Sequence, residues 1–166
     1  MIKSNKVVIS LSGLEQEIHR LVNRERKNNS FIQLVLDSEL SKIARKHSQD
    51  MANKKFFSHQ TPEGKSPTDR AIAAGYTCRK NYGSYYTDGI AENIYMSHLY
   101  RSIIYYNGVP SYNWMTQGEI ANSTVAGWMS SPGHRKNILT ATYDREGIGV
   151  AVSRERNEVY ITQNFC

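Results

Sequence analysis

The chain has 166 residues, the size of one ordinary domain, because a single core of that size already buries roughly 70% of the surface that its unfolded chain would expose. With 39% hydrophobic and 22% charged residues, 4 Pro and 11 Gly, the composition excludes collagen-like and disordered classes. No apolar run approaches the roughly 20 residues of a membrane-spanning helix, and we recognise no signal-peptide cleavage pattern. We therefore expect one soluble globular domain over residues 1–166.

The formal net charge of +6 favours anionic partners such as wall polymers, phospholipid head groups or nucleic acid. The basic residues are scattered, however, and no nucleic-acid-binding signature accompanies them. We therefore expect no nucleic-acid partner. A solvated basic surface is the simpler alternative to contact with an anionic envelope polymer or lipid.

The first part of the chain predicts two amphipathic helices. Residues 12–15 have capping-box spacing, and the apolar residues that follow recur at helical intervals, so we predict a helix over 13–27. Asp37 or Ser38 can cap a second helix, whose apolar face includes His47. A lone histidine on such a face is typically a hydrogen-bonded core residue, and we interpret His47 in that way.

The central part predicts mostly irregular backbone. His59 precedes the turn sequence 61–64, in a position where functional side chains are often presented. A short helix is predicted over 66–75. Residues 76–112 are rich in Tyr, Gly, Asn and Ser, and we predict long loops there, apart from a compact and extended segment at 90–95.

The last part predicts a helix followed by a β-hairpin. Apolar residues at helical spacing over 120–129 indicate the helix, which should break near Pro132, directly before His134. Alternating residues over 147–153 and a second run over 159–165 indicate two strands joined by a turn. The fold class expected from these elements is α+β with a largely antiparallel sheet.

Three candidate functional residues lie at element boundaries rather than on apolar faces: His59, Glu92 and His134. They are far apart in the sequence, so no local motif places them on one face. Two surface histidines and an unrelated glutamate remain the alternative.

The two cysteines, Cys78 and Cys166, lack the close spacing of a zinc ribbon or of a redox pair. They form either one long-range disulfide or two free thiols. An exported protein would favour the disulfide.

Four motifs occur in the order found in the CAP superfamily of cysteine-rich secretory proteins, antigen 5 and pathogenesis-related proteins. They are Phe-Ser-His at 57–59, Ala-Glu-Asn-Ile at 91–94, Trp-Met-Ser-Ser-Pro-Gly-His-Arg-Lys-Asn-Ile-Leu at 128–139 and Gly-Ile-Gly-Val at 147–150. With Asn-Arg at 23–24 and Ala-Arg-Lys-His-Ser-Gln-Asp-Met at 44–51, the chain resembles the microbial branch. The resemblance covers roughly 14–166, and we expect a loop insertion at about 97–117, which matches no family motif.

The resemblance implies a three-layer α-β-α sandwich with an open cleft that holds two histidines and two acidic residues. The family pattern places His59, Glu92 and His134 in this cleft. Ser131 stands where eukaryotic members carry the second glutamate, so a mechanism that needs paired carboxylates is in doubt. Gln163, on the last predicted strand, either faces the cleft or serves only the hairpin.

Two neutral imidazoles can bind Zn²⁺ and leave coordination positions open. Glu92 could then deprotonate a water molecule, or it could hold one imidazole in the metal-binding tautomer. The first functional expectation is therefore a secreted or cell-surface binding domain, in which His59 and His134 hold zinc beside a ligand. The alternatives are a metal-assisted hydrolase of peptide or ester bonds with Glu92 as its base, and a lipid or sterol carrier using the segment 100–112. Whether the protein is an enzyme stays open.

Overall fold

The computed structural model describes residues 8–166. Its helices are α1 (Leu11–Asn28), α2 (Ser38–Lys54), α3 (Pro67–Ala73), α4 (Gln117–Ser130) and α5 (Pro132–Ile138). Its strands are β1 (Val35–Leu36), β2 (Arg79–Asn81), β3 (Tyr86–Asp88), β4 (Ala91–His98), β5 (Tyr100–Tyr106), β6 (Val109–Trp114), β7 (Arg145–Ser153) and β8 (Glu158–Phe165). None of the helices in this part of the chain has the length and apolarity needed to cross a bilayer.

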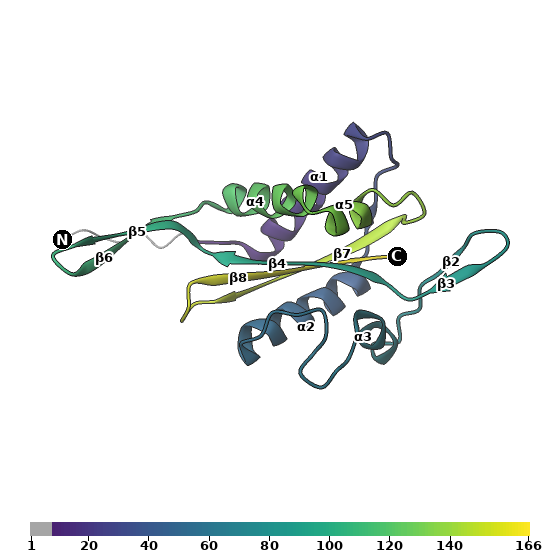
Figure 1. The fold of residues 1–166 in the computed structure, drawn as a ribbon, viewed down its shortest axis with the longest axis horizontal. Helices are drawn as coiled ribbons and strands as arrows, with labels where there is room; N and C mark the ends of the chain where they lie inside the picture. The colour runs from purple at the N-terminus through teal and green to yellow at the C-terminus, as the bar shows by residue number, and fades with distance from the viewer. Residues whose placement is uncertain (1–7) are drawn as a thin grey trace.

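The four strands β1, β7, β8 and β4, in that order, form the middle layer of the structure. Strand β8 pairs antiparallel with both β7 and β4, and only the short strand β1 is parallel to its neighbour. Helices α1, α4 and α5 cover one face of the sheet, and α2 and α3 cover the other (Figure 1). The expected α+β sandwich with a largely antiparallel sheet is therefore confirmed. The predicted β-hairpin at the end of the chain is also confirmed, and it consists of β7 and β8.

Two glycines allow helix α2 to lie directly on strand β7. A Cβ atom added to Gly149 would lie 2.0 Å from the backbone nitrogen of Arg45, and one added to Gly147 would lie 2.2 Å from the carbonyl carbon of Leu40. Real Cβ atoms do not approach other atoms so closely, so larger residues would force helix and strand apart. The opposite face packs α1 and α4 on the sheet through a core that includes Leu14, Ile18, Trp128, Ile148 and Phe165.

The first helix begins differently from the prediction. Ser10 is the N-cap, and its side chain accepts a hydrogen bond from the backbone N–H of Gly13. The predicted capping box at 12–15 is wrong, because Glu15 is buried and has tertiary partners instead. Its carboxylate accepts two hydrogen bonds from Arg45 and one from the backbone N–H of Val150. Helix α2 has Asp37 as its N-cap, as predicted.

The prediction of loops over 76–112 is also wrong, because two antiparallel hairpins, β2–β3 and β5–β6, occupy much of this stretch. The expected loop insertion at 97–117 contains the second hairpin, which projects from the sandwich (Figure 1). Its turn carries Asn107 and Gly108, both with positive φ, and Asn-Gly is a strong signal for a hairpin turn. The Tyr and Ile residues of the stretch suit strands because aromatic and β-branched side chains pack well on a pleated surface.

Cys78 and Cys166 form a disulfide. The bond joins the chain just before β2 to the C-terminal residue, whose backbone is hydrogen-bonded to Arg145 at the start of β7. Of the two possibilities that the sequence left open, the long-range disulfide is therefore confirmed.

Candidate functional site

Glu92 is the centre of the candidate site. It lies on β4, the edge strand of the sheet, and its side chain is only 1% exposed. Oε1 lies 3.0 Å from Nδ1 of His59, and Oε2 accepts a hydrogen bond of 2.5 Å from Nη2 of Arg70. Both carboxylate oxygens therefore have protein partners. Because Glu92 and His59 are in contact, the structure brings two of the three predicted site residues together.

Arg70 and His47 belong to the surroundings of Glu92, although sequence reasoning left both out of the site. Arg70, on α3, also donates from Nη1 to the backbone carbonyl of His59, which ties the loop after α2 to this position. His47 is fully buried on α2, as expected for a core histidine, and its Nε2 lies 3.9 Å from Oε1 of Glu92. Their helical positions were predicted, but only the packing of α2 and α3 on the same face of the sheet shows that they approach one carboxylate.

Burial lowers the pKa of His47, and the positive charge of Arg70 lowers it further, while the charge of Glu92 acts in the opposite direction. Nε2 of His47 lies 3.0 Å from the carbonyl oxygen of Ser58 and must carry the proton to donate to it. Nδ1 is then an acceptor, and it has no hydrogen-bond partner in the described part of the chain. His47 is therefore a neutral residue that holds the segment before His59 in place.

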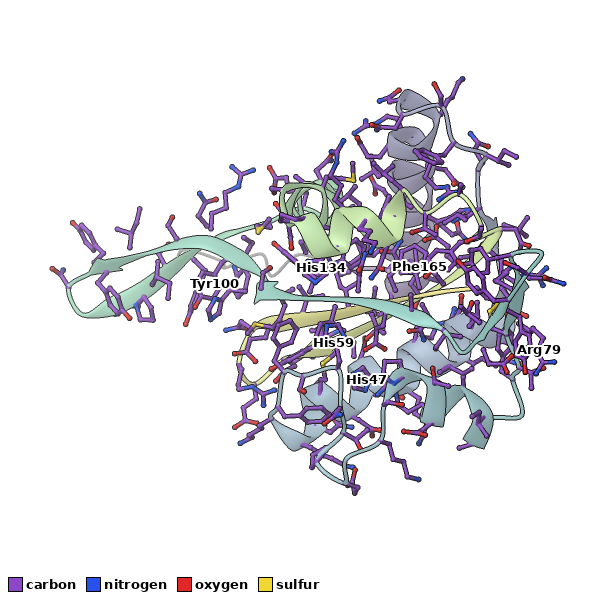
Figure 2. All side chains as sticks on the ribbon, turned by 45° about the vertical axis from the view of Figure 1, so that its right-hand side comes forward. His47, His59, Arg79, Tyr100, His134 and Phe165 are labelled. Atoms are coloured by element: carbon purple, nitrogen blue, oxygen red, sulfur yellow. A yellow bond between two sulfur atoms is a disulfide. The ribbon has the colours of Figure 1, made fainter. Side chains whose placement is uncertain are left out.

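His134 comes from the opposite layer of the sandwich. Helix α4 ends just before Pro132, close to the predicted break, but Pro132 then begins a second helix, α5, which carries His134. In Figure 2, His134 lies on one side of β4, and His59 and His47 lie on the other. Burial lowers the pKa of His134, and the charge of His59 lowers it further, so the two imidazoles interact electrostatically. The imidazole of His134 makes no hydrogen bond to any of residues 8–166.

Asn93 positions the helix that carries His134. Side chains alternate across a strand, so Asn93 lies on the side of β4 opposite to Glu92. Its Nδ2 donates to the carbonyl oxygen of His134, and its Oδ1 accepts from Nδ2 of Asn137 on α5. Two adjacent residues of the edge strand thus hold the two histidine-bearing segments, one from each layer.

Gln163 is buried next to Asn93 and is not exposed at the surface of the site. It is fully buried, and its amide accepts from Nδ2 of Asn93 and donates to Oε2 of Glu146. Oε1 of Glu146 contacts Nδ1 of His19, on helix α1, at 2.6 Å. Ser131 lies at the junction of α4 and α5, where its side chain forms no capping hydrogen bond.

Among the described residues, no group of three or more His, Cys, Asp or Glu side chains is arranged to hold a metal ion. Glu92 is committed to Arg70 and His59, which leaves the imidazoles of His59 and His134 as the remaining donors, one on each side of β4 (Figure 2). The contact between His59 and Glu92 suits metal binding, because a carboxylate at one ring nitrogen of a histidine leaves the other nitrogen free as a ligand. Two neutral imidazoles are a donor set of the kind that zinc accepts, and two protein ligands leave other coordination positions open to water or a ligand.

A separate groove of about 610 Å³ lies between α2, the turn after it and α3. Arg70 contributes to its wall, and Ile43, Ala73 and Tyr76 give it an apolar portion. Lysines and acidic residues line the rest: Lys42, Lys46, Lys54, Lys65, Glu39, Asp50 and Glu63. The groove includes none of the three predicted site residues.

Comparison with known proteins places the chain in a family. Residues 19–165 match the profile of the Cysteine-rich secretory protein family, CAP. The uncharacterized protein YkwD of Bacillus subtilis is 35% identical over 144 residues, which cover 87% of this chain and 45% of that protein. The chain thus spans less than half the length of this relative.

Two solved structures share the fold. An extracellular protein of Bacillus anthracis that contains an SCP domain has a TM-score of 0.66 at 26% identity, with 93% of this chain and 40% of that chain covered. The crystal structure of NaASP2 with Zn²⁺ has a TM-score of 0.58 at 14% identity, with 92% of this chain and 78% of that chain covered. The sandwich and its motifs agree with these comparisons, and the chain belongs to the CAP family of cysteine-rich secretory proteins.

Proposed function

We propose that this CAP domain acts outside the cell as a binding domain, with a zinc ion held by His59 and His134. The contact between Nδ1 of His59 and Oε1 of Glu92 carries the proposal. It directs the other nitrogen of the half-exposed His59 ring away from the carboxylate and fixes the orientation of the ring. When bound, zinc would supply a Lewis acid with open coordination positions.

The state of His134 supports the same function. A metal ligand must be the neutral imidazole, and the lowered pKa of His134 favours that form at neutral pH. NaASP2, a fold relative, has been crystallised with Zn²⁺. The ligand beside the metal is proposed to be an envelope component, in keeping with the extracellular B. anthracis relative and the net charge of +6.

The contacts of Glu92 favour a positioning role over that of a general base. A base must reach a water molecule, but both oxygens of this carboxylate are occupied and the side chain is buried. Hydrolysis of peptide or ester bonds and carriage of lipids or sterols remain predictions of the sequence.

Calorimetric zinc titration at about neutral pH tests the proposal, since unperturbed histidine is mostly neutral there. We expect saturable binding by the wild type and loss of binding in the H59A/H134A double variant. H98A is the matched control, because His98 is an exposed histidine at the far end of β4. Absence of binding in the wild type, or equal loss in H98A, would overturn the proposal.

A further inference from the structure

The β5–β6 hairpin projects well beyond the sandwich (Figure 1). Its base is anchored where the backbone N–H of Met115 donates to the carbonyl of Leu99, and both residues belong to the core between α1 and the sheet. Beyond the base, β5 and β6 pair only with each other, so the ribbon has two open edges within the described part of the chain. Residues 102–113 contain no charged side chain. An extended ribbon of this length without charge is unusual on a protein surface, because exposed ribbon edges are commonly protected by charged residues.

The end of this ribbon, residues 104–109, is the hairpin tip. Its four large side chains are exposed by 66% to 74%: Ile104, Tyr105, Tyr106 and Val109. The cross-strand pairs Tyr105↔Pro110 and Tyr106↔Val109 are adjacent along the ribbon and therefore lie on opposite faces of it. The tip is consequently apolar on both faces. In contrast, the aromatic side chains nearer the base, Tyr100, Tyr112 and Trp114, contact one another on one face.

We propose that the hairpin tip docks on a lipid bilayer and inserts its apolar side chains at the interface. Contact with a groove of a protein or with a flat glycan surface would use one face of a ribbon and leave the other in water. A bilayer surrounds an inserted tip and therefore accounts for apolar side chains on both faces. Tyrosines suit this depth because an apolar ring with a polar end is favoured at the boundary between acyl chains and head groups.

The geometry limits how deep the tip can enter. The open edges of the ribbon carry unpaired backbone groups that hydrocarbon cannot satisfy, so full insertion is excluded. From Ile104 to the turn, the ribbon extends over three residues, or roughly 10 Å. This matches the depth of about 5 to 10 Å at which apolar side chains of interfacial segments are buried. The net charge of +6 favours a bilayer that contains anionic lipid.

Co-sedimentation with vesicles tests this proposal independently of zinc. The probes are phosphatidylcholine vesicles with and without phosphatidylglycerol, and the protein is the full chain without added metal. We expect binding that increases with phosphatidylglycerol and weakens at least about tenfold in Y105S/Y106S. The matched control is Y85S/Y86S, which removes two tyrosines of similar exposure, 59% and 58%, from the other projecting hairpin. The control should bind as the wild type does.

Depth is measured with a tryptophan added at each hairpin, and the emission of the native Trp114 and Trp128 is taken from the wild type and subtracted. Emission of Y105W should be quenched by brominated lipid chains, whereas emission of Y86W should not. Failure of the wild type to bind vesicles, or equal binding by Y105S/Y106S and wild type, would overturn the proposal. Two further assays identify other occupants. Tip-dependent binding to insoluble wall glycan without vesicle binding would assign a glycan partner, and tip-dependent self-association would assign a second copy of the chain.

Discussion

Nη2 of Arg70 lies 2.5 Å from Oε2 of Glu92, and both side chains are buried beside the half-exposed ring of His59. Arg70 thereby neutralises the carboxylate that orients His59, and its second donor holds the backbone of that histidine. The ion pair is thus both a structural link between α3 and β4 and the support of the proposed metal ligand.

Replacing Glu92 should be costly for stability. E92Q leaves the guanidinium of Arg70 buried without its counter-ion, and we expect a loss of about 3 kcal/mol in the free energy of unfolding. Urea denaturation monitored by circular dichroism measures this loss. The control is E63Q, which breaks the exposed pair with Lys54 and should leave stability nearly unchanged. Equal stability of E92Q and wild type would show that the buried pair contributes little.

Reduction of the disulfide should destabilise the protein strongly. Cys78 and Cys166 are separated by 88 positions, and the loop-entropy relation gives a contribution of roughly 4 to 5 kcal/mol for such a loop. Denaturation midpoints with and without reductant test this value. The C78S/C166S variant should match the reduced wild type and should not respond to reductant. If the midpoint of the wild type also stays unchanged when reductant is added, the disulfide does not make this contribution.

Stability should fall in mildly acidic solution. The pKa of His47 is lowered in the folded state, so the unfolded chain takes up a proton near its ordinary pKa of about 6.5 while the folded chain stays neutral. Stability is therefore complete above that pH and is lost as the pH falls toward the folded pKa, by up to about 1.4 kcal/mol per pH unit for each such group. His134 contributes in the same direction.

The variant H47Q isolates the contribution of His47 to the loss of stability in acid. Glutamine can keep a donor toward the carbonyl of Ser58 but cannot take up a proton at this pH. Denaturation at a series of pH values between about 7.5 and 5, on either side of the ordinary histidine pKa, should therefore give a shallower slope for H47Q. Parallel slopes for the two proteins would assign the acid sensitivity to other groups.

The contact between α2 and β7 predicts a further effect. In G149A the added methyl group would lie 2.0 Å from the backbone nitrogen of Arg45, and neither element can yield without disturbing the core. We expect a loss of about 3 kcal/mol or more in unfolding free energy. G133A is the control, because a Cβ at Gly133 meets no atom within 4 Å and should be tolerated. A denaturation midpoint for G149A close to that of wild type would mean that α2 and β7 can move apart with little loss of unfolding free energy.

Much of the fold could be predicted from local patterns. The apolar periodicity of α1, α2 and α4, the alternation in β7 and the resemblance of four motifs to one family led to the α-β-α sandwich. The Asn-Gly turn of the β5–β6 hairpin was also a local signal, and it was overlooked because the Tyr-rich composition of residues 76–112 suggested loops. Glu15 shows the opposite error, since its capping-box spacing is real but Arg45 and Val150 take its carboxylate.

The sequence by itself determined the candidate site residues: His59, Glu92 and His134 were selected by position and family motif. Only the tertiary structure decided what surrounds them. Arg70 comes from α3 and His47 from α2. Hydrogen bonds and ion pairs between segments so far apart produce no periodic pattern in the amino-acid sequence. The role of Glu92 depends on which groups occupy its two oxygens, and that occupancy arises only when α3 and the loop that carries His59 lie against the edge strand β4.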